Sequence, residues 1–309
     1  MAGEIGDRAA QVADDRLEVA PPPVPMILLQ AAVGGLLLGA VYALFSSGLA
    51  LIWGMMNFIN FAHGEFVMLG MYVALVVTWA HAGPETFGPA AAIALFFLGV
   101  VVYLSLIKHV MRGPMLSQIL STFGLALLLR YSAFYIFKSD FRTLPDSTLS
   151  GSINLGGIYI GRAQLVAGLV AGLLALGMHI MLTRTALGSR MLAVAEDRNA
   201  AMLMGIRPDR MQALAWGLSA ASAGIAGALM AIAYPFSPSV GETFALTAFV
   251  VVALGGFGSV PGAMIAGFII GLVEALSGFL IGPIYKDVVV YALFVAILWV
   301  RPQGLLGKL

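Results

Sequence analysis

Long apolar segments separated by short clusters of charged residues dominate this sequence. About twenty consecutive apolar residues are enough to cross the hydrocarbon layer of a bilayer. Charged residues make up only 10% of the chain and mean hydropathy is +0.98. A soluble globule could not cover its surface with so few charges, because surface area remains large relative to volume at this size. The pattern therefore predicts an all-α polytopic membrane protein and excludes an ordinary cytosolic enzyme.

The lengths of these segments predict how many helices cross. The apolar segments span residues 26–56, 66–80, 88–107, 116–137, 165–182, 211–233, 244–281 and 288–300. At helical rise the first extends about 46 Å and the 244–281 segment about 57 Å, so each is predicted to hold two helices or a helix and a half-span. We expect about 8–10 transmembrane helices, with discontinuous segments near 57–65 and 255–262. The second break is predicted from poor helix formers, namely Gly255, Gly256, Gly258 and Pro261.

Charge divides the chain into a tail and a membrane domain. Residues 1–25 are acidic and end in a proline cluster, which predicts a disordered tail without the basic start of a signal peptide. Residues 26–309 form the predicted transmembrane domain. Five arginines place the 183–210 loop in the cytoplasm under the positive-inside bias. Counting crossings puts the 138–164 loop outside, and a double crossing by 26–56 puts the N-terminus inside.

Composition excludes several classes of partner and site. The net charge is +1, and the basic residues are scattered or paired with acids, so no nucleic-acid partner is expected. The chain has no cysteine, which excludes disulfides, cysteine-based zinc sites and thiol catalysis.

The polar segment 57–65 is the first candidate site, as part of the substrate pathway. Irregular backbone at membrane depth must line an enclosed or watery cavity, because lipid offers no hydrogen bonds. The alternative is a short interfacial turn in which Asn and Gly only end helices. His63 and Glu65 are two positions apart and do not face each other on a helix, so no metal site is predicted. The candidate pathway residues are Asn57, Asn60, Phe61, His63 and Glu65.

The 183–210 loop is the second candidate site. It holds eight charged residues interleaved with Ala, Leu and Met, a pattern that suits a short helix docking into a partner's groove. The alternative is a helix that lies in the lipid interface. Ser189 is predicted to cap a short helix, Gly205 to close it, and Pro208 to begin the next span.

Few ionisable residues stand inside the predicted spans, where each needs a partner or a water-lined cavity. Glu274 is predicted to play a structural role by hydrogen-bonding the backbone freed at 255–262. Arg130 is predicted to pair with either Glu65 or Glu274, and the sequence does not choose between them.

Four blocks of sequence resemble the permeases of branched-chain amino acid ABC transporters, the LivH type, in the order of that family. They cover the chain from about residue 30 to its C-terminus, and the acidic tail lies outside the resemblance. The blocks are GAVYAL, GLALIWG, INFAHGE and MLG within 39–70, GSRMLAVAED, MGI and DR within 188–210, ALGGFGSVPGA at 253–263, and EALS with YKD within 274–287.

The resemblance implies a non-catalytic permease subunit of an ABC importer in the bacterial inner membrane. Such a subunit would move branched-chain or other hydrophobic amino acids by ATP-driven alternating access. The implied partners are ABC ATPase subunits, a second, related permease of the LivM type and an extracytoplasmic amino-acid-binding protein. No cofactor is expected in this chain, since ATP and Mg²⁺ would bind the ATPase; the chain has no phosphate-binding loop of its own. The implied ATPase-coupling residues are Arg190, Ala195, Glu196, Asp197, Ala200 and Gly205.

Two alternatives remain open at this point. A stand-alone secondary transporter or channel would use the breaks near 57–65 and 255–262 as its two discontinuous helices. An ABC permease for urea or short amides would share the architecture and differ in solute. A membrane-embedded enzyme finds no support, because neither HExxH nor G-x-S-x-G occurs.

Overall fold

A computed structural model describes residues 24–144, 149, 151–301 and 303–307. Within these residues, six helices are long and apolar enough to cross a membrane, judged by length and composition. The all-α polytopic fold class is therefore confirmed. Two shorter apolar helices, α3 (His63–Trp79) and α11 (Val240–Gly255), bring the number to eight, the lower end of the predicted 8–10.

The predicted acidic tail, residues 1–25, lies outside the described residues apart from Val24 and Pro25, which begin the first helix. The helices are α2 (Val24–Met56), α3 (His63–Trp79), α4 (Phe87–Val102), α5 (Lys108–Val110), α6 (Met115–Phe137), α7 (Arg162–Arg184), α8 (Ala186–Glu196), α9 (Arg198–Leu203), α10 (Pro208–Ala233), α11 (Val240–Gly255), α12 (Val260–Leu280) and α13 (Lys286–Val300). A 3₁₀ turn η1 (Pro84–Thr86) and a π-helical segment η2 (Tyr103–Ile107) make one continuous span with α4 and α5.

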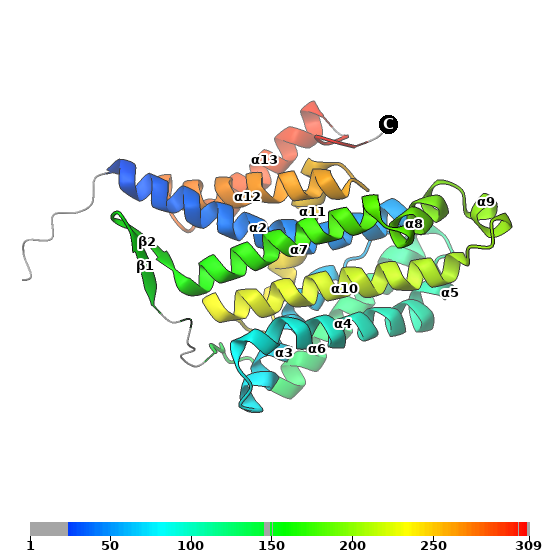
Figure 1. Cartoon of the computed structure of the whole chain (residues 1–309), viewed down its shortest axis with the longest axis horizontal. Coiled ribbons are helices and arrows are strands. Elements are labelled where there is room, and N and C mark those ends of the chain that lie inside the picture. Colours follow the sequence, from blue (N-terminus) through cyan, green and yellow to red (C-terminus); the bar gives the residue numbers. More distant parts are fainter. Residues whose placement is uncertain (1–23, 145–148, 150, 302, 308–309) are drawn as a thin grey trace, which may run out of the picture.

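Two features mark the ends of the helix bundle. Strands β1 (Ser152–Leu155) and β2 (Ile158–Gly161) pair antiparallel, with Ser152 opposite Gly161, and form a hairpin at one end. Helices α8 and α9 lie at the other end (Figure 1). We call these the hairpin end and the loop end. Helices α2, α7 and α10 pack side by side between them (Figure 1).

The first apolar segment is a single helix, so the predicted double crossing of 26–56 is wrong. Helix α2 has 33 residues and is about 50 Å long. Every residue from 39 to 52 is buried, so this half of the helix is surrounded by protein and its length need not match the lipid. It contains no proline after Pro25 that could break it.

The glycines of α2 serve close packing instead of a chain reversal. A Cβ on Gly35 would lie 2.7 Å from the Cβ of Ala275, and one on Gly39 would lie 2.8 Å from the Cα of Phe268, both on α12. Because glycine has no side chain, the backbones of α2 and α12 approach each other closely at these positions. Helix α2 starts at the hairpin end, close to β2. The first described residues therefore lie at the end of the bundle opposite the 183–210 loop. The predicted double crossing would have placed them on the same side as that loop.

Both predicted breaks are confirmed. Residues 57–62 separate α2 from α3, and residues 256–259 separate α11 from α12. Gly256 and Gly258 have φ values of 101° and 80°, which only glycine adopts readily. Ser259 caps α12 by accepting a hydrogen bond from the Gly262 backbone N–H (3.1 Å), and Pro261 stands in the first turn of α12.

Helices α2–α4 and helices α10–α12 form two similar units that run in opposite directions. Helix α2 runs from the hairpin end to the loop end, and α10 runs the other way (Figure 1). After each of them, a six-residue segment (57–62 or 234–239) leads into a shorter apolar helix, α3 or α11. The packing is matched as well, because the long helix of each unit packs on the third helix of the other: α2 packs on α12, and α10 packs on α4. This is an inverted repeat of the kind seen in membrane transporters.

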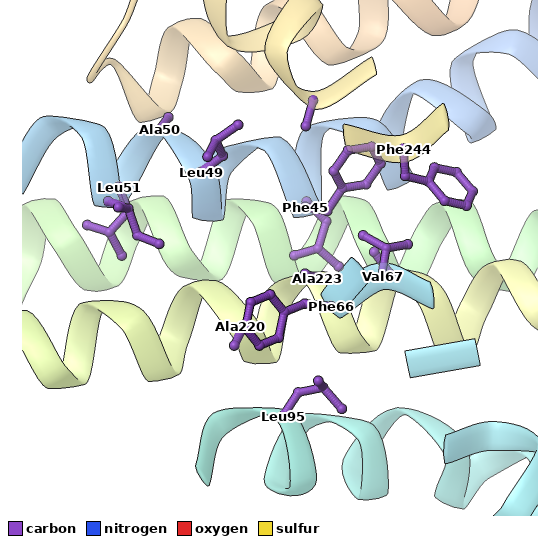
Figure 2. Close-up of a cluster of buried hydrophobic side chains, with 14 of the residues drawn as sticks. Phe45, Leu49, Ala50, Leu51, Phe66, Val67, Leu95, Ala220, Ala223 and Phe244 are labelled. Atoms are coloured by element: carbon purple, nitrogen blue, oxygen red, sulfur yellow. The ribbon is translucent and has the colours of Figure 1, made fainter. Parts of the chain in front are cut away.

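A hydrophobic core fills the space where the two units meet. The rings of Phe45 on α2 and Phe244 on α11 lie 5.9 Å apart, edge to face, with Val67 of α3 beside them (Figure 2). Trp216 of α10 is fully buried and packs edge-on against Phe58, 5.7 Å away. This core holds the first turns of α3 and α11 in place.

Candidate functional site

The first turns of α3 and α11 meet inside the bundle. Residues 57–62 return alongside α2 from the loop end, so that His63 reaches the backbone of Phe45, eleven residues before the end of that helix. A Cβ on Gly64 would collide with the Gly241 carbonyl oxygen, and a Cβ on Gly241 would collide with the Glu65 carboxylate. Two glycines therefore permit the contact between the two short helices.

A charged triad spans this contact. Arg130 of α6 donates from Nε (3.0 Å) and Nη2 (2.6 Å) to Oε1 of Glu65, and from Nη1 (2.9 Å) to Oε2 of Glu242. The side chain of Glu65 is 1% exposed, that of Arg130 18% and that of Glu242 66%. Of the two glutamates predicted as partners of Arg130, the structure thus selects Glu65.

Helix dipoles help to hold these carboxylates at membrane depth. Glu65 lies in the first turn of α3 and Glu242 in the first turn of α11. A helix N-terminus carries a partial positive charge that favours an anion. Arg130 and the two helix N-termini together offset the charge of the two glutamates, which satisfies the requirement that intramembrane charges be paired.

The other predicted pathway residues near Glu65 are bonded to backbone or packed on rings. His63 is fully buried, and its Nε2 lies 2.8 Å from the Phe45 carbonyl oxygen. Asn60 accepts a hydrogen bond from the Ala62 backbone N–H (3.1 Å). Phe61 lies against Phe249 of α11, with ring centroids 5.1 Å apart. These contacts stabilise the break, and a role for these residues in the solute pathway stays a prediction.

Asn57 lies apart from this group. It stands at the loop end with a φ of 51°, a left-handed conformation that Asn tolerates better than most residues. It lines a cavity of about 530 Å³ together with Trp53, Phe257 and Glu196. The structure therefore divides the predicted pathway residues between the buried contact of α3 with α11 and a cavity beside α8.

Glu274 does not bind the backbone at 255–262, so that prediction is wrong. It accepts hydrogen bonds from the Tyr42 hydroxyl (2.7 Å) and from Nζ of Lys286 (2.6 Å) at the start of α13. It lies twelve residues beyond Gly262, which is about 18 Å along α12. A nearby ammonium group is a better partner for a carboxylate than a distant backbone.

The C-terminal residues close the glycine-rich break in place of Glu274. The backbone N–H groups of Leu305 and Leu306 donate to the carbonyl oxygens of Leu254 (2.7 Å) and Gly255 (2.9 Å). These are carbonyls that the end of a helix leaves without an intrahelical partner. Gly256 permits this contact, since a Cβ there would meet the backbone of Gly307.

The 183–210 loop folds into two short helices instead of one. Thr185 caps α8 by accepting from the Gly188 N–H (3.2 Å), and Asp197 caps α9 by accepting from two backbone N–H groups. Ser189 stands inside α8 and bonds to the Thr185 carbonyl, so the predicted cap is wrong by one turn. Gly205 ends α9 with a φ of 78°.

Pro208 begins α10 as predicted, and an ion pair fastens α9 to it. Asp209 of α10 binds Lys108 of α5 (2.7 Å) and Arg198 of α9 (2.8 Å). Beyond this anchor, Leu203 is 89% exposed and Met204 82% exposed. The loop thus presents an apolar knob, Leu203 with Met204, on a fastened base.

The predicted coupling residues lie at different places around this knob. Arg190, Ala200 and Gly205 are exposed. Ala195 and Glu196 line the cavity that also contains Asn57, and Asp197 is engaged as the cap of α9. Their roles in coupling stay predictions. Leu203 and Met204 were not among the predicted coupling residues, although their position directly before Gly205 places them at the end of α9.

Glu242 is the site residue that sequence analysis missed. A signal for it exists, because the two inverted units share a pattern of a Gly-Glu pair, a leucine four residues after the glutamate and an aromatic-valine pair three residues later. The pattern occurs as Gly64-Glu65, Leu69 and Tyr72-Val73, and again as Gly241-Glu242, Leu246 and Phe249-Val250.

Comparison with known proteins identifies the family. Residues 31–298 match the family described as "Branched-chain amino acid transport system / permease component". The chain belongs to this permease family. The resemblance seen in the sequence is confirmed, and the chain is a multi-pass membrane permease component.

Individual members of the permease family match over nearly the whole chain. The high-affinity branched-chain amino acid transport system permease protein BraD of Pseudomonas aeruginosa is 32% identical over 295 residues, which cover 91% of this chain and 96% of BraD. The corresponding protein LivH of Escherichia coli K12 is 34% identical over 298 residues, 92% of this chain and 96% of LivH. The E. coli permease protein LivM is 27% identical over 308 residues, 91% of this chain and 71% of LivM.

Proposed function

We propose that this chain is the membrane-spanning subunit of an ABC importer in a bacterial inner membrane. It translocates branched-chain or other hydrophobic amino acids by ATP-driven alternating access. Family membership and the names of BraD and LivH support the solute class. The observation that carries the ATP-driven mechanism is the apolar knob of Leu203 and Met204, exposed at the loop end.

The knob suits docking of an ATPase because its base is fastened to the bundle. Asp209 joins α9 to α10 and α5 through Arg198 and Lys108, so a push on α9 is transmitted to α10. Helix α10 packs against α2, α3 and α4, which include both helices around the first break. Movement of one packed element against another is a known way to convert a local push into a change of access.

The remaining partners follow from the family and from the composition of the site. A second, related permease completes the pore, an inference supported by the similarity of this chain to LivM as well as to LivH. ATP and Mg²⁺ bind the ATPase subunits, and an extracytoplasmic amino-acid-binding protein delivers the solute at the hairpin end. The chain itself performs no catalysis.

The inverted repeat favours one alternative, a stand-alone secondary transporter. Such transporters place discontinuous helices at the centre of two inverted units, and α3 and α11 have this arrangement. A stand-alone transporter has no use for a fastened apolar knob outside the membrane. Within the ABC mechanism, urea or short amides are the alternative solutes.

Co-purification tests the docking role of the knob. We expect Leu203→Asp to abolish co-purification of the ATPase while the chain still inserts, because a charge there opposes burial in an apolar groove. Ile284→Asp is the matched control, since Ile284 is 85% exposed and lies between α12 and α13 at the other end of the bundle. Retention of the ATPase by Leu203→Asp, or equal loss in both variants, would contradict the proposed docking.

A further inference from the structure

The start of α11 carries an exposed stripe on a helix that is otherwise mostly buried. Glu242, Thr243 and Leu246 are exposed, whereas most later residues of α11 are buried. The stripe occupies the first two turns, beside the contact between Gly64 and Gly241. Within the described residues nothing covers it.

The depth of this stripe makes its exposure informative. Glu242 binds Arg130, which lies seven residues from the hairpin end of α6 and fifteen from its loop end, or about 10 Å and 22 Å. The carboxylate is therefore inside the hydrocarbon layer. A carboxylate that is 66% exposed at this depth cannot face lipid, because an ionised group there needs a partner or water.

The hydrogen bonds of the triad leave acceptor capacity on this surface. Within the described residues, Arg130 is the one group that binds the Glu242 carboxylate, and it binds Oε2 alone. Oε2 of Glu65, buried against Gly241, has no hydrogen-bond partner in the same part of the chain. One exposed and one buried carboxylate oxygen thus remain free at the start of α11, which suits a cationic hydrogen-bond donor.

We propose that the stripe of Glu242, Thr243 and Leu246 lines the water-filled solute path, and that Glu242 offers its free oxygen to the ammonium group of the solute. This inference rests on the proposed function, because a path for a zwitterionic solute requires a permease. The second permease subunit encloses the path from the other side. Arg130 fixes the carboxylate in position, so Glu242 acts as a specificity-determining residue for a positively charged group.

Charged thiol reagents test both parts of the proposal, and a chain without native cysteine gives no background reaction. Thr243→Cys is introduced into the full importer in lipid vesicles, alone and together with Glu242→Gln. Each form reacts with trimethylammonioethyl methanethiosulfonate, a cation, and with sulfonatoethyl methanethiosulfonate, an anion. Leu128→Cys is the matched control, since Leu128 is 63% exposed on α6, two residues from Arg130, and is expected to face lipid.

We expect the thiol of the Thr243→Cys variant to react with both reagents, which shows that water reaches it, and to favour the cation. Glu242→Gln should lower the ratio of the cationic to the anionic rate by about tenfold, because a carboxylate in a confined path concentrates cations. The Leu128→Cys variant should react with neither reagent. An inert thiol at position 243, an equally reactive thiol at position 128, or a ratio unchanged by Glu242→Gln would each overturn the proposal.

The outcome is distinguishable from failure of the proposed function. ATP-driven uptake is measured on the Leu128→Cys importer in the same vesicles. If uptake requires ATP while the Thr243→Cys thiol stays inert, the proposed function stands and the path lies elsewhere. If uptake does not require ATP, the proposed function fails, whatever the reactivity at position 243.

Discussion

Gly64 and Gly241 face each other across the contact between α3 and α11, and each stands directly before a glutamate of the charged triad. The two residues occupy equivalent positions in the inverted units, so the contact lies where the pseudo-symmetry axis passes through the bundle. Neither position has room for a Cβ. Close packing of two backbones thus brings Glu65 and Glu242 within reach of a single arginine.

We predict that Gly64→Ala destabilises the protein by about 1–3 kcal/mol, the usual cost of overpacking a filled site. The added methyl group collides with the Gly241 carbonyl oxygen and with the Ala245 backbone N–H. Thermal unfolding in detergent measures the effect. Gly177→Ala is the control, because a Cβ at Gly177 meets nothing within 4 Å and should leave stability unchanged or slightly raised. Equal melting temperatures for both variants would show that the contact is not tight.

Arg130→Gln should destabilise the protein by about 3–5 kcal/mol, because it leaves a buried carboxylate without its cation. Glu65 accepts two hydrogen bonds from Arg130 and is 1% exposed. The double variant Arg130→Gln with Glu65→Gln should recover much of this loss, since it removes the unpaired charge. Melting temperatures of the single and double variants in detergent measure the coupling, and a double variant no more stable than Arg130→Gln would contradict this explanation.

Glu65 and Glu242 should differ in how much they contribute to stability, as measured by melting temperature. Glu242 is 66% exposed, so Glu242→Gln should reduce stability by about 1 kcal/mol or less, as for other exposed ion pairs. An effect of Glu242→Gln on stability as large as that of Arg130→Gln would mean that the triad acts as one structural unit. It would also remove the distinction between a buried anchor and an exposed pathway residue.

Asp209→Asn should reduce ATP-driven uptake severalfold while the chain remains folded. It weakens the ion pair with Arg198 that fastens α9 to α10 and the ion pair with Lys108 that fastens α10 to α5. These pairs are partly exposed and each contributes about 1 kcal/mol or less to stability, so uptake should fall more than the melting temperature does. Asp140→Asn is the control, because Asp140 pairs only loosely with Arg142, at 3.6 Å. A parallel fall of uptake and stability would contradict a specific role in coupling.

Lys286→Met should destabilise the protein more than Glu274→Gln does. Without Lys286, the Glu274 carboxylate loses its cationic partner and keeps the Tyr42 hydroxyl alone, and an uncompensated buried charge is costly. Glutamine at 274 can still accept the Tyr42 hydrogen bond and carries no charge. The ranking is read from melting temperatures in detergent, and the reverse order would contradict the claim that an unpaired Glu274 carboxylate is the costlier loss.

The breaks in the helices could be predicted because their causes are local. Asn57 and Asn60 interrupt an apolar segment, and Gly256 with Gly258 interrupts another, so both discontinuities were visible in the sequence. The course of α2 was not predicted, because its length suits the buried centre of a bundle and not a bilayer. That centre exists only once α10 and α12 have packed around it.

The partners of the ionisable residues could not be predicted, for a different reason. Glu274 meets Lys286 and Tyr42, the latter 232 positions away, and no local pattern reports such a contact. Arg130 was recognised as a partner for a glutamate, yet the choice of Glu65 depends on how α6 packs beside α3. Glu242 could have been found by comparing the two inverted units, since its Gly-Glu pair repeats that of Glu65.

The central claim is that ATP hydrolysis on a partner drives transport through this chain. Uptake of radiolabelled leucine into vesicles tests it, with the chain reconstituted with its permease partner, ATPase and binding protein. We predict that uptake requires ATP on the ATPase side and continues when an ionophore collapses the proton gradient. Uptake that persists without ATP and stops with the ionophore would contradict the account and identify a secondary transporter.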